Sequence, residues 1–379
     1  MPNLRHEGST DLTRLGSSKV ISGRRLWLFR TLAVVGALGI GSGAGWLIWQ
    51  IYQAAGPTAS ERAARDFAVE WEKLPPVKRD LLELAGYGPR DRLAVASNFD
   101  GALVFSGSVM ELHLQRGYRL RAGQENLWAR PGPWPFQMPM PDVPDVRDAL
   151  DRAGVPVTTT EHINSFGCRG REPDEVDTYE YRVLVLGDSF AQGILVEDDD
   201  IFCARLEGEL LQSSGRKTLV ANSGVIGYST EQEYYTLEEL APRLRPHVAV
   251  LCFYANDVHR DHHAVFRSRR PAGDWASAER WLERCAHYCR TNKFRFVVAV
   301  IPDRSQMTNR TIRRNYQHRL ETITTKLGIY LIDPDERFLA RRTKPLWLQG
   351  DDHFAPAGHA LFAQVLAEHL RQWVPRKAE

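Results

Sequence analysis

The stretch Arg182-Val-Leu-Val-Leu-Gly-Asp-Ser-Phe-Ala-Gln-Gly193 decides the fold and holds the first candidate site residue. Val183–Leu186 is apolar and rich in β-branched residues, which is typical of a buried strand in a parallel sheet. Gly187 ends the run, and the residues after the serine predict a helix. Ser189 would then lie on a strand-to-helix turn, where open α/β sheets place their sites. Free backbone N–H groups at this turn favour a nucleophile, although Asp188 and Ser189 could instead only cap the helix.

Apolar strand-like segments alternate with amphipathic segments after residue 180. The predicted strands are Arg182–Leu186, Thr218–Asn222, Val248–Phe253, Phe294–Ile301 and Ile329–Ile332. The predicted helices are Phe202–Leu211, Glu231–Leu240, Asp274–Cys289, Thr311–Leu327 and Pro356–Trp373. This alternation requires a parallel sheet covered on both faces. The fold class is therefore α/β, with a flavodoxin-like, doubly wound, five-stranded parallel sheet.

The segment 31–52 contains no charged residue, and about 20 such residues suffice to cross a bilayer. Five basic residues precede it within 20 positions and only two follow within 20, so residues 1–30 are expected to form a basic cytoplasmic tail. We expect an uncleaved single-pass helix in the plasma membrane, with the catalytic domain outside the cytoplasm. A cleaved signal peptide is the alternative, but residues 53–56 are a poor cleavage site. Small residues four apart in the helix would allow a homodimer.

The remaining chain divides into three expected regions. Residues 53–90 indicate a juxtamembrane stalk, residues 91–178 an accessory β-rich region, and residues 179–376 the α/β domain. Within the accessory region, Pro131–Pro141 carries five prolines and is expected to be a loop. The formal net charge of the chain is +2 with both signs interspersed, so nothing in the composition suggests a nucleic-acid-binding surface, and no nucleic-acid partner is expected.

Two of the predicted strands end in residues that could stabilise an oxyanion. Gly227, in the segment after the second strand, could present an unobstructed backbone N–H to developing negative charge. Asn256, directly after the third strand, could donate a side-chain hydrogen bond to the same oxygen. Taken singly, each has an ordinary alternative, because Gly227 could be a turn glycine and Asn256 a strand-end cap.

A histidine near the carboxyl terminus is the candidate general base. Gly350-Asp-Asp-His-Phe354 leads into the last predicted helix. His353 could accept the serine proton, while a carboxylate holds its tautomer and orientation. Asp351, two residues before the histidine, is the favoured carboxylate, and Asp352 remains an alternative.

Together, these blocks resemble the SGNH (GDSL-type) hydrolase superfamily in order and spacing over about residues 160–375. The resemblance implies that Ser189 is the nucleophile, His353 the base and Asp351 the acid. It also implies an oxyanion hole made of the Ser189 amide, the Gly227 amide and the Asn256 side chain. Many members place the acid three residues before the histidine, where this chain has Gly350; a second pattern, two residues before, fits Asp351.

The segment Ile163-Asn-Ser-Phe-Gly-Cys-Arg-Gly170 resembles one that precedes Gly-Asp-Ser in membrane-anchored bacterial members of this superfamily. Asn164 and Arg169 could brace the site or bind substrate, but a structural turn is the favoured interpretation.

A metal site is the rival interpretation of one further cluster. Asp257, His259, Asp261, His262 and His263 crowd a short segment, and carboxylate–histidine clusters can bind metal. Adjacent histidines rarely aim at one ion, and four nearby arginines would repel a cation. We therefore predict no metal and no organic cofactor.

The predicted function is that of a serine esterase that cleaves acyl esters, chiefly O-acetyl esters, on an extracytoplasmic glycan. The superfamily resemblance and the membrane segment imply this substrate class and a location at the bacterial plasma membrane. An acyltransferase in polysaccharide or cell-wall modification and a non-catalytic glycan-binding or assembly module are the alternatives. Expected partners are an acylated glycan or small ester, the lipid bilayer and polysaccharide-modifying proteins. Trp128, Trp134 and Trp347 are candidate sugar-binding aromatics, although ordinary packing is favoured for each.

Overall fold

A computed structural model describes residues 71–88, 109–131, 138–258, 273–309, 312, 314–349 and 351–374. The predicted tail and membrane segment (residues 1–52), Trp134 and the histidines at 259, 262 and 263 lie outside these ranges. Within the described ranges, no helix is both long enough and apolar enough to span a bilayer.

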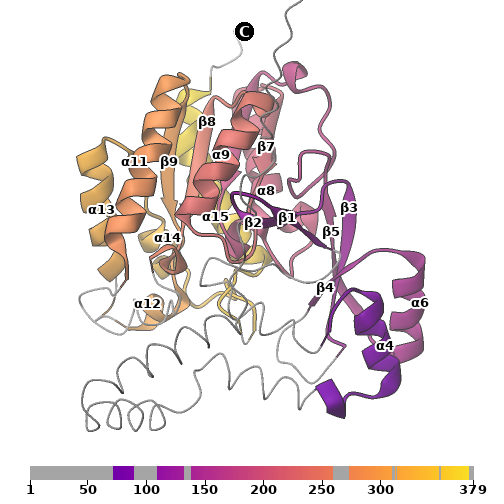
Figure 1. The fold of residues 1–379 in the computed structure, drawn as a ribbon. Helices are drawn as coiled ribbons and strands as arrows, with labels where there is room; N and C mark the ends of the chain where they lie inside the picture. Colours follow the sequence, from indigo (N-terminus) through magenta and orange to yellow (C-terminus); the bar gives the residue numbers. More distant parts are fainter. Residues whose placement is uncertain are drawn as a thin grey trace, which may run out of the picture. The chain divides into compact units, whose positions relative to one another are not determined.

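A five-stranded parallel sheet forms the centre of the fold (Figure 1). Its strands lie in the order β10-β9-β8-β6-β7, which is the flavodoxin-like order 2-1-3-4-5 counted along the chain. The strands are β6 (Tyr181–Leu186), β7 (Thr218–Asn222), β8 (Val248–Phe253), β9 (Arg295–Val300) and β10 (Tyr330–Ile332). Every residue of β7 and β8 is buried, as expected for parallel strands covered on both faces. The predicted α/β sheet is confirmed.

Helices cover both faces of this sheet (Figure 1). Helices α9 and α11 pack together against one face, and α8 and α15 pack together on the other. The helices of this domain are α7 (Ser189–Gln192), α8 (Phe202–Ser214), α9 (Thr230–Leu244), α11 (Trp275–Thr291), α12 (Arg304–Thr308), α13 (Asn315–Leu327), α14 (Asp335–Ala340) and α15 (Pro356–Leu370). The carboxyl ends of β6, β7 and β8 therefore open onto one edge, where the candidate site residues follow.

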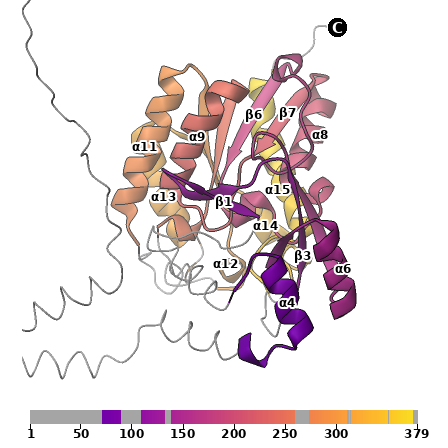
Figure 2. The same cartoon turned by 45° about the vertical axis from the view of Figure 1, so that its right-hand side comes forward.

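A smaller lobe precedes this domain (Figure 2). Its antiparallel sheet has the order β4-β3-β5, and two helices share its apolar core. The elements of the lobe are α4 (Pro76–Leu84), β3 (Gln124–Ala129), β4 (Met138–Pro141), α6 (Pro144–Ala153) and β5 (Val157–Ile163). Leu81 and Leu82 of α4 are fully buried in that core. This part of the segment predicted as a stalk thus packs into the accessory lobe.

A separate hairpin lies against the α/β domain. It consists of β1 (Met110–His113) and β2 (Gly117–Leu120), paired antiparallel. Buried Tyr118 and Leu120 of β2 share an apolar cluster with Val225 and Tyr228, which follow β7. In both views the hairpin lies in front of α9 (Figures 1 and 2). It therefore reaches the loop that carries Gly227.

Two sequence-based expectations are wrong in detail. Residues 138–141 of the proline-rich segment form β4, where only a loop was expected. Proline is tolerated there because β4 is an edge strand of its sheet, where a missing N–H costs no ladder bond. The helix expected from Thr311 begins at Asn315, because Arg314 before it adopts a left-handed conformation with φ of 56°. Neither change moves a candidate site residue.

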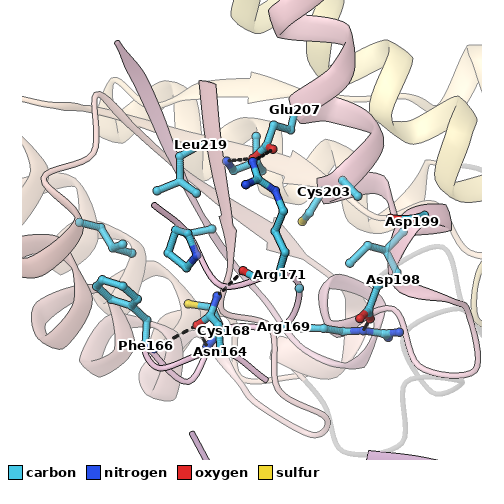
Figure 3. Close-up of a pocket in the computed structure, with 17 residues that line it drawn as sticks. Asn164, Phe166, Cys168, Arg169, Arg171, Asp198, Asp199, Cys203, Glu207 and Leu219 are labelled. Atoms are coloured by element: carbon cyan, nitrogen blue, oxygen red, sulfur yellow. Dashed lines mark hydrogen bonds and ion pairs between the residues drawn. The ribbon is translucent and has the colours of Figure 1, made fainter. Parts of the chain in front are cut away.

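The outer edge of β7 is occupied by a side chain of α8 and by the main chain of Arg169. Glu207 Oε2 of α8 accepts a hydrogen bond from the Val220 N–H at 2.9 Å. Arg171 Nη2 donates to the other oxygen of Glu207 at 2.6 Å. The Arg169 N–H donates to the Asn222 carbonyl at 2.8 Å. Figure 3 shows the cavity beside this edge, and its lining residues include none of the candidate catalytic ones.

Candidate active site

Ser189 is the first residue of α7, directly after the strand β6 and the turn that ends it. Asp188 caps this helix, since its Oδ1 accepts a hydrogen bond from the Phe190 N–H at 2.9 Å. At Gly187 a Cβ atom would lie 2.6 Å from the Ala191 Cβ, so only glycine lets the turn close this tightly. Ser189 itself is 7% exposed. The turn thus holds the hydroxyl at the carboxyl end of β6 in a nearly enclosed position.

His353 links the serine to a carboxylate. Its Nε2 lies 2.7 Å from the Ser189 Oγ, and its Nδ1 lies 2.5 Å from Asp351 Oδ1. The same Asp351 oxygen accepts the His353 backbone N–H at 2.8 Å. The Phe190 ring packs against the imidazole, with 4.6 Å between centroids. The carboxylate in contact with the imidazole is therefore that of Asp351, the favoured of the two predicted alternatives.

The charge state of Asp351 suits this contact. Burial acts to raise the pKa of the Asp351 carboxyl, but the hydrogen bond and charge of His353 and two backbone N–H groups outweigh it. The net result is a lowered pKa. Asp351 is consequently an anion that accepts the His353 Nδ1–H and leaves Nε2 free to accept a proton from the serine.

Asn256 lies in the short 3₁₀ turn Ala255–Asp257 that follows β8. Its Nδ2 donates to Asp188 Oδ2 at 2.7 Å, so the residue next to the serine fixes the orientation of the amide. An amide nitrogen has two N–H groups, and the second remains to serve an oxyanion. The Asn256 Oδ1 is buried without a hydrogen-bond partner among the described residues. The structure therefore places Asn256 beside the candidate nucleophile.

Gly227 lies on the loop that follows β7, and this loop packs directly on α7. At Gly224 a Cβ atom would lie 2.3 Å from the Gln192 backbone nitrogen, so the approach of the two segments requires glycine there. Asn222 fastens the contact, because its Nδ2 donates to the Ala191 carbonyl at 2.8 Å. The Val225 N–H donates to the Gly187 carbonyl at 3.1 Å. All five predicted site residues thus come from segments that meet around α7.

The chain is similar to the solved structure of a lipase/acylhydrolase from Enterococcus faecalis, with 18% identity over 52% of this chain and 100% of that chain and a TM-score of 0.43. It is also similar to the solved structure of the acetyl xylan esterase AlAXEase, with 18% identity over 50% of this chain and 99% of that chain and a TM-score of 0.41. It has no match among curated protein sequences. The model of the GDSL-like lipase/acylhydrolase family matches residues 185–361. Residues 185–361 therefore form a domain of the SGNH (GDSL-type) hydrolase superfamily.

The presence of this domain makes the protein a hydrolase that acts on ester bonds. The matched residues 185–361 include Ser189, Gly227, Asn256 and the Asp351–His353 pair. The accessory lobe and the hairpin β1–β2 lie before the matched residues. Their contacts with the hydrolase domain are therefore features that the family pattern does not describe.

Arg169 is a buried link between β5 of the accessory lobe and α7. Its Nη1 donates to the Gly193 carbonyl at 2.6 Å and to the Gln192 carbonyl at 3.0 Å, and its Nε pairs with Asp198 Oδ1 at 2.7 Å (Figure 3). The same Nη1 lies 3.7 Å from Glu161 Oε2 of β5. Arg169 therefore braces the end of α7 through main-chain carbonyls. Asn164 makes a local turn instead, accepting the Phe166 and Cys168 N–H groups.

The sequence did not single out Gln192, Asn222 or Glu161. Gln192 Oε1 accepts the Ile226 N–H at 2.8 Å, while its Nε2 donates to Glu161 Oε2 at 3.2 Å. Only the position of Asn222 and Gln192 beside recognised motifs could have drawn attention to them. No local pattern marks Glu161, because its role depends on how β5 lies against α7.

The candidate metal cluster and the candidate sugar-binding aromatics lie only partly within the described residues. Asp257 is bonded to the Thr230 hydroxyl and the Tyr254 N–H. Among the residues the structure describes, no group of three or more histidine, cysteine or acidic side chains could hold a metal ion. Trp128 is only 2% exposed, so it offers no stacking face to a sugar. Trp347 is partly buried against Phe354.

A group of buried carboxyls lies under the site. Burial and then the neighbouring Asp188 charge raise the pKa of Asp257 to about 8. Burial also raises the pKa of Asp188, although the Phe190 N–H, His353 and Asn256 oppose it. Burial and Asp257 raise the pKa of Glu233, whose two oxygens have no hydrogen-bond partner among the described residues. The folded protein therefore retains protons that the unfolded chain releases.

We expect the pH dependence of stability to reveal the proton that the buried Asp257 carboxyl retains in the folded protein. The Asp257 pKa in the folded state exceeds the unfolded value of about 3.9, so the free energy of unfolding falls as pH rises from about 4 to about 8, by up to ~1.4 kcal/mol per pH unit. Asp257→Asn removes this term. The stability of the wild type relative to the variant should therefore decline between pH 5 and 8, as measured by urea denaturation.

The control for this experiment is Glu231→Gln, which changes an exposed carboxyl at the start of α9. It should run parallel to the wild type over the same pH range. A difference in stability between wild type and Asp257→Asn that stays constant from pH 5 to 8 would show that the carboxyl is already ionised in the folded protein.

Proposed function

We propose that this hydrolase is a serine esterase that removes short acyl groups, chiefly O-acetyl groups, from a glycan outside the cytoplasm. The continuous contact from Asp351 through His353 to the Ser189 Oγ is the observation that carries the proposal. A binding or assembly module would have no use for a buried serine aligned with an oriented imidazole. The same contact supports the roles that we assign to the three side chains.

The reaction follows from these contacts. The Ser189 Oγ attacks the ester carbonyl carbon while its proton passes to His353 Nε2, and Asp351 stabilises the resulting imidazolium. The carbonyl oxygen takes the negative charge and accepts hydrogen bonds from the Gly227 and Ser189 N–H groups and the Asn256 amide. The tetrahedral intermediate expels the alcohol, which takes the proton from His353. Water then repeats the steps on the acyl-enzyme and releases the acid.

The enclosure of the serine supports a short acyl group. Ser189 is 7% exposed, and at Gly227 a Cβ atom would lie 2.9 Å from the Tyr118 hydroxyl. Little room therefore remains beside the glycine that faces the acyl carbonyl. An acetyl group requires the least space of the common acyl groups.

The glycan and the location rest on the sequence. The uncharged segment 31–52, with its basic flank, supports a single-pass anchor in the bacterial plasma membrane with the hydrolase domain on the outer side. Esters on that side include those of cell-wall and exported polysaccharides, which makes polysaccharide-modifying proteins the expected partners. Transfer of the acyl group to a sugar hydroxyl would use the same acyl-enzyme and differ only in the acceptor.

The test uses the purified full-length chain. A fluorophosphonate should label the protein once, and peptide mapping should place the label on Ser189. Incubation with a chemically O-acetylated polysaccharide should release acetate, whereas an octanoyl ester should react at least about tenfold more slowly than the matching acetyl ester.

A second arm distinguishes hydrolysis from transfer. Adding the deacetylated polysaccharide should leave acetate release unchanged for an esterase. A transferase would move isotopically labelled acetyl groups to the added acceptor, with less free acetate. Absence of labelling in the folded wild type would contradict the serine mechanism itself.

A further inference from the structure

Gly227 occupies a tight turn of a class that has two common types, I and II. The Tyr228 N–H donates to the Val225 carbonyl at 3.1 Å and closes a four-residue turn. Gly227, the third residue, has φ of 77°, the value expected in a type II turn. Type I and type II turns differ by a flip of the middle peptide, which here joins Ile226 to Gly227. Whatever fixes this peptide decides on which side the Gly227 N–H lies.

Tyr118 of the hairpin holds this peptide. Its hydroxyl donates to the Ile226 carbonyl at 2.8 Å, and the tyrosine is buried. In a planar trans peptide the carbonyl and the N–H point in opposite directions, so a fixed Ile226 carbonyl also fixes the Gly227 N–H. A hydrogen bond accepted by the carbonyl also polarises the peptide and strengthens its N–H as a donor.

Gln192 binds the other backbone polar group of Ile226, which is its N–H. Its Oε1 accepts the Ile226 N–H at 2.8 Å, and its Nε2 donates to Glu161 of the accessory lobe at 3.2 Å. Both backbone polar groups of Ile226 are therefore bonded to side chains. The N–H of the next residue, Gly227, donates to no acceptor among the described residues. It is thus the one donor of this turn that remains for a ligand.

We propose that Tyr118 is a positioning residue for the oxyanion hole, so that the β1–β2 hairpin is a working part of the hydrolase site. The inference rests on the proposed function, in which the Gly227 N–H stabilises the oxyanion. Without the Tyr118 hydroxyl, the Ile226–Gly227 peptide is free to rotate, and its N–H loses the direction that the transition state needs. Substrate binding in the ground state depends much less on this donor.

The hydroxyl remains a donor at any pH at which the enzyme works. Burial and the neighbouring Tyr228 raise the pKa of Tyr118, while a hydrogen bond from Gln232 opposes this rise. The phenol therefore keeps its proton, as the bond to Ile226 requires.

Tyr228 offers a matched control. It is buried, and its ring packs edge-on against Tyr118 with 5.4 Å between centroids. Its hydroxyl donates to the Tyr118 main-chain carbonyl at 2.5 Å, across the same interface. Tyr228→Phe therefore removes a buried hydroxyl-to-carbonyl bond between the same two segments without touching the Ile226–Gly227 peptide.

The experiment compares wild type, Tyr118→Phe and Tyr228→Phe as full-length proteins in hydrolysis of an activated acetate ester. Loss of one oxyanion donor lowers kcat by about 10²–10³-fold, so misorientation of that donor should lower it by about 10–100-fold. We expect this loss in Tyr118→Phe with KM within about twofold, and kcat of Tyr228→Phe within about threefold of wild type. Affinity for a trifluoromethyl ketone, which forms a tetrahedral oxyanion on the serine, should fall in parallel with kcat/KM.

Several outcomes would overturn the inference. Equal kcat in the two variants, or a loss confined to KM, would assign Tyr118 a structural role only. Ser189-dependent turnover in the wild type keeps such a failure distinct from failure of the proposed function. Without that turnover, both the proposed function and the role of Tyr118 would be contradicted. Should Tyr118→Phe lose its near-ultraviolet circular dichroism, 4-aminophenylalanine at position 118 keeps the ring and an N–H donor for the Ile226 carbonyl. We expect kcat of this folded variant to stay within about threefold of wild type, and a loss of about tenfold or more would contradict the proposal.

Discussion

Ser189→Ala is expected to lower kcat for an activated acetate ester by about 10⁴–10⁶-fold, with KM nearly unchanged. The serine supplies the atom that forms the acyl-enzyme, so the variant retains only what the oxyanion donors contribute to direct attack by water. In the wild type His353 Nε2 lies 2.7 Å from the Ser189 hydroxyl. In the variant this hydroxyl is missing, so the histidine has no proton to accept from the protein. Steady-state kinetics on the purified full-length chain measure the loss.

Ser223→Ala is the matched control for this prediction. Ser223 is a buried serine that follows the neighbouring strand β7, and its hydroxyl donates to the Val185 carbonyl at 2.6 Å. Its loss should cost about 1 kcal/mol of stability and change kcat by no more than a few-fold. Comparable kcat in Ser189→Ala and Ser223→Ala would remove Ser189 from the mechanism.

Asp351→Asn is expected to lower kcat by about 10³–10⁴-fold, whereas Asp352→Asn should remain within about threefold of wild type. Asp351 Oδ1 accepts both the Nδ1–H and the main-chain N–H of His353. An amide carries no charge to stabilise the imidazolium, and its NH₂ group favours the tautomer whose Nε2 is protonated and cannot accept the serine proton.

The paired aspartates make this comparison sharp. Both substitutions remove one carboxylate from the same short segment, so the change in net charge near the site is nearly the same. Thermal unfolding of both variants controls for loss of structure. A greater loss in Asp352→Asn would mean that the histidine is oriented by the other carboxylate when substrate is bound.

The strands could be predicted closely because their signal is local. Thr218–Asn222 and Val248–Phe253 have the predicted bounds, since fully buried strands are continuous apolar runs that polar residues end. The start of α13 could not be predicted, because the left-handed Arg314 that precedes it depends on surrounding packing. β4 was missed because the tolerance for its prolines comes from its place at the edge of a sheet.

The residues of the site likewise fall into those that local sequence motifs predict and those that only the packing of distant segments brings together. Ser189, His353 and Asp351 lie in short ordered motifs, and the structure brings them into direct contact. Tyr118 and Gln192 meet Ile226 only after the hairpin and α7 have packed on the loop that follows β7. Tyr118 is 108 residues from its partner in sequence, and no spacing rule reaches that far.

The occupied edge of β7 affects how the protein behaves in concentrated solution. An open edge strand is a template for strand addition by another molecule, and natural proteins protect such edges with charged side chains. Here Glu207 binds the Val220 N–H, and the Arg169 main chain binds the Asn222 carbonyl. A second molecule could add a strand only by displacing an ion-paired carboxylate. Resistance to aggregation therefore depends on a glutamate that takes no part in ester cleavage.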